Sequence, residues 1–219
     1  MSIKENLNKI RASLPKEVTL VAVSKTKPVE SIMEAYNAGQ RVFGENKIQE
    51  MTAKWEKLPK DIEWHMIGHI QRNKVKYMAE YVSLIHGVDS LKLLKEINKQ
   101  AEKHNRVIPC LLQLHIAMES TKFGLDPSEL NRLIASEEFN ALSNIKIKGL
   151  MGMATFTDNI SQIKEEFLLL KNTFDQLQQK LNDIEVLSMG MSGDYDIAIE
   201  VGSTMVRLGS SIFGARNYS

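Results

Sequence analysis

The sequence has a single cysteine, almost no net charge and no long uninterrupted hydrophobic run. Cys110 is alone among 219 residues, which excludes an internal disulfide and suits a reducing compartment. Its apolar neighbours predict a buried side chain. Twenty-eight basic and 27 acidic residues give a formal charge of +1, which argues against a nucleic acid or a membrane surface as partner. No run has signal-peptide character or the roughly 18 apolar residues of a membrane span, so we expect a cytoplasmic protein with a small ligand.

Apolar segments rich in β-branched residues recur along the whole chain. Most are nearly continuous rather than alternating, as parallel strands buried on both faces require, and helical patterns lie between them. The eight predicted strands cover residues 18–24, 41–44, 64–70, 82–88, 108–116, 145–153, 186–191 and 205–213.

Local signals define several helices. Asp126, Pro127 and Glu129 have the spacing of an N-cap, a first-turn proline and a capping-box acid. In 160–181, apolar residues step by three and four; this favours an outer helix packed on a sheet over a coiled-coil seam. A further helix, about residues 2–13, precedes the first strand.

This alternation predicts a single α/β domain over residues 1–219: a (β/α)8 TIM-type barrel with an extra N-terminal helix. The 43% hydrophobic content is enough for one substantial core. An open doubly wound sheet is the alternative. No Gly-x-Gly-x-x-Gly follows the first strand, which weakens a dinucleotide-binding version of that sheet.

In barrels of this type the ligand-binding residues follow the carboxyl ends of the strands. Lys25 directly follows the first strand. Partial burial lowers the pKa of a lysine and leaves a neutral amine that can form a Schiff base with a carbonyl compound. Lys27, two residues further on, is an alternative that spacing alone does not exclude.

The last two strands are followed by glycine- and serine-containing loops. Within the last apolar segment, 205–213, Gly209 and Ser210 follow the strand and could begin a helix, and Ser192 follows the seventh strand. Barrels of this type bind phosphate at these two loops. Turns of this composition also occur without a ligand. Arg207 would point inward from the last strand, where an unpaired guanidinium is costly, so we expect it to have a partner.

His65 and His69 are four residues apart, a spacing that on a helix could bind zinc. The segment is predicted as a strand and lacks the accompanying glutamate, so we predict no metal site.

Several ordered motifs resemble the pyridoxal phosphate homeostasis protein family, which is related to the N-terminal barrel of alanine racemase. The resemblance covers nearly the whole chain. It implies pyridoxal 5′-phosphate (PLP) as cofactor, a Schiff base on Lys25, phosphate binding by Ser192, Gly209 and Ser210, Arg207 facing the pyridine ring, and Asn46 beside the cofactor. The motifs lie at residues 21–28, 43–46, 64–68, 71–74, 149–151, 187–194 and 206–214.

The resemblance implies a role in intracellular PLP (vitamin B6) homeostasis, in which the protein stores the cofactor or delivers it, with PLP-dependent apoenzymes as candidate acceptors. No exposed heptad seam requires a dimer, so we expect a monomer. Alanine racemase has a further β-domain that supplies a second catalytic base, whereas this chain ends at Ser219. We therefore expect no enzymatic turnover and assign no catalytic residue. Two alternatives are a racemase-like PLP enzyme and an aldolase-like barrel whose lysine binds a sugar phosphate.

Overall fold

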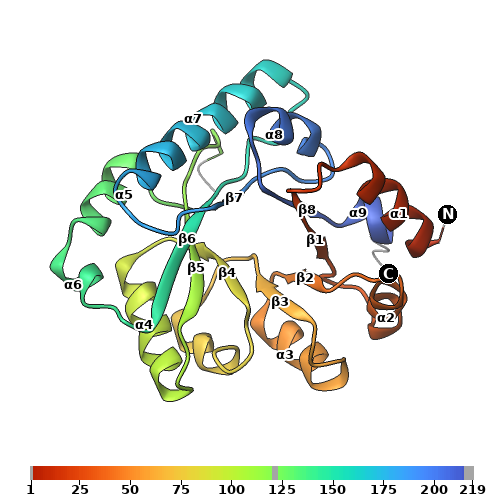
Figure 1. Ribbon diagram of the computed structural model, residues 1–219, viewed down its shortest axis with the longest axis horizontal. Helices are drawn as coiled ribbons and strands as arrows, with labels where there is room; N and C mark the ends of the chain where they lie inside the picture. Colours follow the sequence, from red (N-terminus) through yellow and green to blue (C-terminus); the bar gives the residue numbers. More distant parts are fainter. Residues whose placement is uncertain (1, 120–122, 215–219) are drawn as a thin grey trace.

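A closed barrel of eight parallel strands forms the centre of the molecule, with helices around it (Figure 1). The computed structural model describes residues 2–119 and 123–214. The strands are β1 (Thr19–Val23), β2 (Val42–Glu45), β3 (Glu63–Met66), β4 (Leu84–Val88), β5 (Ile108–Gln113), β6 (Ile145–Met151), β7 (Val186–Ser188) and β8 (Met205–Leu208). The helices are α1 (Ile3–Ser13), α2 (Val29–Asn37), α3 (Ile48–Lys57), the 3-10 helix η1 (Arg72–Tyr77), α4 (Leu91–Lys103), α5 (Pro127–Ile134), α6 (Glu137–Asn140), α7 (Ile160–Gln178), α8 (Tyr195–Val201) and α9 (Ser210–Phe213).

Parallel pairing of β1 with β8 closes the barrel, which confirms the predicted fold and excludes the open sheet. In this pair Val21 lies opposite Arg207. Several strands end earlier than predicted. The 205–213 segment is the clearest correction, because β8 ends at Leu208 and Ser210–Phe213 turns into a short helix. Gly190, with a φ of 99°, similarly turns the chain away soon after β7.

Hydrophobic side chains fill both faces of the barrel wall. Val21, Leu84, Leu111, Met151 and Met205 form a small cluster inside the barrel. Neighbouring strand residues point outward into the large core beneath the helices, to which Ala22, Ile85, Leu112, Leu150 and Val206 belong. Burial on both faces explains the nearly continuous apolar strands.

The helices form where their local signals predict them. Asp126 makes the predicted capping box with Glu129. On α7 the packed stripe consists of Ile163, Phe167, Leu170, Phe174 and Leu177. It begins one turn later than predicted, because Ile160 is 65% exposed.

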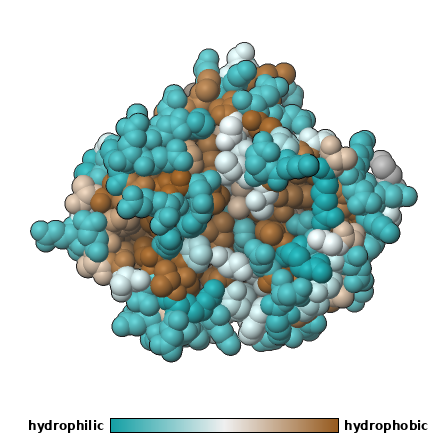
Figure 2. Space-filling view, in the orientation of Figure 1, coloured by the Kyte–Doolittle hydropathy of each residue, from teal (hydrophilic) through white to brown (hydrophobic). Residues whose placement is uncertain are grey.

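The extra N-terminal helix is confirmed as α1. It lies beside α9 (Figure 1). The side-chain amide of Asn6 donates a 3.0 Å hydrogen bond to the Ile212 carbonyl. On the face of the molecule that Figure 2 shows, in the same orientation as Figure 1, hydrophilic residues lie around the edge and hydrophobic residues lie toward the middle. No helix in the described ranges has the length and apolar character to cross a membrane.

Candidate functional site

The ends of β1, β7 and β8 meet at one end of the barrel and bring together most of the predicted site residues. Lys25 is half-buried just after β1. Gly209, the N-cap of α9, packs against the end of that strand, because a Cβ placed on it would lie 3.3 Å from the Val23 carbonyl oxygen. The Gly209 N–H donates a 3.4 Å hydrogen bond to Ser192 Oγ, which joins the two predicted phosphate loops. Ser210 follows directly and is exposed.

Lys27, the alternative lysine, contacts the end of α9. Lys27 Nζ donates hydrogen bonds to the carbonyl oxygens of Phe213, at 3.0 Å, and Gly214, at 3.3 Å. Thr26, between the lysines, has a left-handed φ of 63°, so the backbone turns sharply there. Lys27 thus ties this turn to the end of α9.

Arg207 points inward from β8, and the partner expected from the sequence is present. Its side chain is buried, with Nη1 donating a 2.6 Å hydrogen bond to Ser188 Oγ and Nη2 donating one of 3.0 Å to the Gly152 carbonyl. Burial lowers the pKa of Arg207 to about 10, against a smaller opposing effect of Asp194. The guanidinium therefore stays protonated at neutral pH.

A chain of polar side chains continues from Arg207 across the barrel interior. Ser188 Oγ lies 3.0 Å from His86 Nδ1, and His86 Nε2 lies 3.0 Å from His65 Nδ1. Because Arg207 donates to Ser188 Oγ, the serine hydroxyl can donate to His86, whose Nε2–H then donates to His65.

Both histidines of this hydrogen-bonded series are buried, and both are neutral. Burial lowers the pKa of His65 to about 3 and is the main cause that lowers the pKa of His86, followed by the nearby His65 and Arg207. Sequence reasoning missed His86 and Ser188. Their only signal is a polar residue within a predicted apolar strand, and Ser188 is in fact the last residue of β7. His65, considered above for zinc, contacts His86 instead, and the described residues contain no group of three or more His, Cys, Asp or Glu placed to hold a metal.

Asn46 lies one strand away from the main group, half-buried after β2. The backbone of Gly68 lies against it, since a Cβ on Gly68 would be 2.4 Å from the Asn46 carbonyl oxygen. His69 belongs to the rim. Its Nδ1 is 3.3 Å from Asp89 Oδ2, and its ring stacks on Phe123 with centroids 3.9 Å apart.

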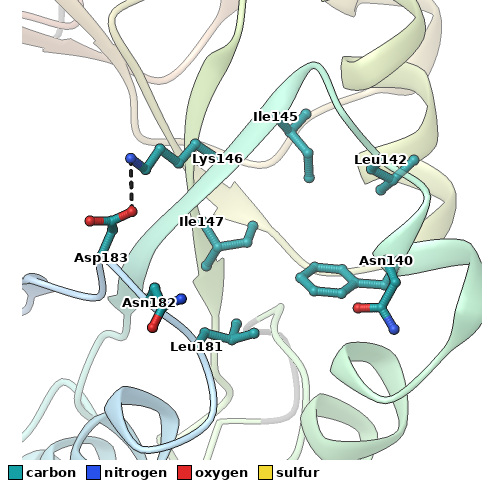
Figure 3. A pocket seen from close by; sticks show the side chains of 9 residues that line it. Asn140, Leu142, Ile145, Lys146, Ile147, Leu181, Asn182 and Asp183 are labelled. Carbon is teal, nitrogen blue, oxygen red and sulfur yellow. Dashed lines mark ion pairs between the residues drawn. The ribbon is translucent and has the colours of Figure 1, made fainter.

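A separate cavity of about 260 Å³ lies at the opposite end of the strands, where β6 and β7 begin (Figure 3). Exposed Lys146 and Asp183 form a 2.9 Å ion pair at its edge, and Ile145, Ile147 and Leu181 contribute apolar side chains. None of the predicted site residues lines it, so the candidate site is the group at the carboxyl ends of the strands.

Comparison with known proteins identifies related sequences over the full length of the chain. Residues 1–217 match the family described as "Alanine racemase, N-terminal domain". The chain is 40% identical over 234 residues to the pyridoxal phosphate homeostasis protein of Vibrio alginolyticus, covering 100% of this chain and 99% of the relative. It is 43% identical over 201 residues to the protein of the same name from Aquifex aeolicus, covering 91% and 87%.

Solved structures share the same barrel. PipY of Synechococcus elongatus, determined with PLP bound, superposes with a TM-score of 0.90 at 35% identity, over 97% of this chain and 100% of PipY. An alanine racemase of Clostridium difficile superposes with a TM-score of 0.74 over 100% of this chain and 57% of the racemase. At 18% identity, the racemase shows a likeness of fold alone.

Proposed function

Because the chain belongs to the pyridoxal phosphate homeostasis family, which carries the alanine racemase N-terminal barrel, we propose that it binds PLP on Lys25 to store or deliver it. The observation that carries the proposal is the junction of three strand ends. Gly209 and Ser192 are hydrogen-bonded to each other beside the end of β1, the strand that Lys25 follows, and Arg207 lies buried on β8 just before them.

The residues at this junction fit the parts of PLP. Ser192, Gly209 and Ser210 would hold the phosphate through hydroxyl and backbone N–H donors, in the loops that bind phosphate in such barrels. Arg207 would face the ring nitrogen, and Asn46 would lie at the side of the ring. When bound, PLP supplies an aldehyde. A neutral Lys25 amine would attack its carbon, and loss of one water would leave a C=N bond.

Binding without turnover is part of the proposal. A protonated Arg207 would donate a hydrogen bond to the lone pair of the ring nitrogen and oppose a second positive charge there, so the nitrogen would stay neutral and the ring would be a weaker electron sink. The relatives named above are called homeostasis proteins, which agrees with a binding role. Delivery to PLP-dependent apoenzymes and a monomeric state belong to the same proposal.

The test is a PLP titration of three proteins, followed by visible absorption of the Schiff base: wild type, Lys25→Ala and Lys27→Ala. We expect the absorption band in wild type and in Lys27→Ala, and its loss in Lys25→Ala. Lys27→Ala is the matched control because it removes a lysine from the same turn and keeps the Lys25 amine. Loss of its contact with the end of α9 can slow formation of the band but not abolish it at equilibrium. A band that persists in Lys25→Ala and disappears in Lys27→Ala would contradict the assignment.

A further inference from the structure

Three charged side chains lie behind the Lys25 turn, between the barrel wall and α3. Lys54 of α3 is 6% exposed, and its Nζ lies 2.7 Å from Oε1 of both Glu45 and Glu50. Glu45, at the end of β2, is completely buried, and its pKa is raised chiefly by that burial. We call Glu45, Lys54 and Glu50 the charged triad. Buried ion pairs are weak stabilisers compared with apolar residues of the same volume, so stability alone accounts poorly for this group.

The charged triad contacts the backbone on both sides of Lys25. The Ser24 hydroxyl donates a 2.6 Å hydrogen bond to Glu45 Oε1, and the Ser24 carbonyl accepts one of 2.8 Å from Lys54 Nζ. The Thr26 N–H donates a 2.6 Å hydrogen bond to Glu50 Oε1. Residues 24 and 26 are therefore both held by the triad, and Lys25 lies between them.

The Thr26 conformation shows why such contacts are needed. A threonine with a φ of 63° is in a sparsely populated region and costs on the order of 1 kcal/mol, so surrounding contacts must hold it there. The hydrogen bond to Glu50 is one such contact. Lys27, bonded to the end of α9, holds the following residue. The path of the backbone at Lys25 is thus fixed from two sides.

A fixed backbone matters for a lysine that must reach a carbonyl carbon. The lysine side chain is flexible, and a misplacement of about 1 Å in a reacting group can lower a rate by about 100-fold. The phosphate loops follow β7 and β8. In the described part of the chain, no hydrogen bond joins Ser192, Gly209 or Ser210 to the charged triad. Loss of the triad's contacts at residues 24 and 26 would therefore affect bond formation more than capture of the phosphate, because Lys27 still attaches the turn to the end of α9.

We propose that Glu45, Lys54 and Glu50 are positioning residues for Lys25, which set the rate of C=N bond formation and leave non-covalent capture of the cofactor unchanged. This inference rests on the proposed function above. It assigns the triad no direct contact with PLP.

The experiment compares Lys54→Met with Lys57→Met, a matched control on the exposed face of the same helix. Two probes are used: PLP, and 4′-deoxypyridoxine 5′-phosphate, which has the same ring and phosphate but no aldehyde. We expect Lys54→Met to bind the analogue with unchanged affinity and to form the C=N bond with PLP at least about tenfold more slowly in stopped-flow absorption. Lys57→Met should match wild type with both probes.

A readout on the ligand-free protein makes the test independent of the cofactor. Amide hydrogen exchange at Thr26 should be at least about tenfold faster in Lys54→Met and in Glu50→Ala than in wild type. Glu50→Ala also replaces Lys54→Met if the latter does not fold, because Glu50 is partly exposed and contacts Thr26 directly.

If Lys54→Met lost affinity equally for PLP and for the analogue, the charged triad would support only the folded structure and would not position Lys25. That result would overturn the proposal. So would a wild-type rate of bond formation in folded Lys54→Met or Glu50→Ala. Failure of the proposed function itself gives a different result, because wild-type protein would then form no C=N bond on Lys25.

Discussion

Arg207 Nη1 donates a 2.6 Å hydrogen bond to Ser188 Oγ, which places the guanidinium of β8 at the head of the neutral chain Ser188–His86–His65. The second contact, to the Gly152 carbonyl, fixes the plane of the guanidinium. A cation held in one orientation, with neutral histidines behind it, is a permanent hydrogen-bond donor. This arrangement suits holding a cofactor better than moving protons.

We predict that PLP-loaded protein does not turn over amino acids. A ring nitrogen facing Arg207 would be unprotonated and would stabilise a carbanion poorly. L-alanine, D-alanine and a panel of other amino acids are incubated with loaded protein in deuterated water, and Cα exchange and chirality are followed. Exchange on the order of one per second or faster, lost in Lys25→Ala, would instead support the racemase-like alternative.

The buried histidines predict acid sensitivity of the fold. Their pKa values are lower in the folded protein than the ordinary value of 6.5. Below pH 6.5 the unfolded chain therefore binds more protons than the folded protein, and for His65 this difference extends down to its folded-state pKa of about 3. Stability present above pH 6.5 is therefore lost as the pH falls. Each histidine contributes a slope of up to about 1.4 kcal/mol per pH unit.

Urea unfolding over this pH range checks the prediction with His65→Gln and the exposed control His104→Gln. The slope of unfolding free energy against pH should decrease by about 1.4 kcal/mol per unit in His65→Gln and remain at the wild-type value in His104→Gln. An unchanged slope in His65→Gln would show that His65 is not held neutral.

The phosphate loops predict a strong preference for PLP over pyridoxal. A hydrogen bond to a charged group contributes about 1.5–3 kcal/mol, so Ser192→Ala should weaken PLP binding by about 10- to 100-fold. Its affinity for pyridoxal, which lacks the phosphate, should not change. Ser143→Ala, at the other end of the barrel, is the control. Equal wild-type affinities for the two aldehydes would remove the role of Ser192, Gly209 and Ser210.

The backbone of β6 requires a glycine at position 149. Its φ is 152°, and a Cβ there would lie 1.8 Å from the Val186 carbonyl oxygen, at the point where the β5–β6 register shifts. Gly149→Ala should lower the free energy of unfolding by at least about 3 kcal/mol. Gly193→Ala, with nothing within 4 Å of the added Cβ, should stay within about 0.5 kcal/mol of wild type in the same urea titration. Comparable stabilities would contradict this steric argument.

The barrel could be predicted because strand and helix signals are local. Runs of apolar residues mark strands such as β5, and the capping box at Asp126 marks a helix. The apolar segment 205–213 was harder to divide, because Ile212 and Phe213 are as apolar as the strand itself. Only the glycine and serines at 209–211 indicate that β8 ends at Leu208 and that a helix follows.

The site could be predicted only in part. Lys25 and the serine loops follow strands and stand out by position. His86 and Ser188 are 102 residues apart, and Lys54 is 30 residues from the Ser24 carbonyl that it contacts. Each of these looks like an ordinary polar residue until the barrel closes and shows which side chains share its interior.

The most direct test of the account is to load the wild-type protein with PLP, reduce it with borohydride and map the modified peptide by mass spectrometry. Reduction converts the C=N bond into a stable C–N bond on whichever lysine carries the cofactor. We predict the pyridoxyl adduct on Lys25. An adduct chiefly on Lys27, or none on either lysine, would contradict the central claim.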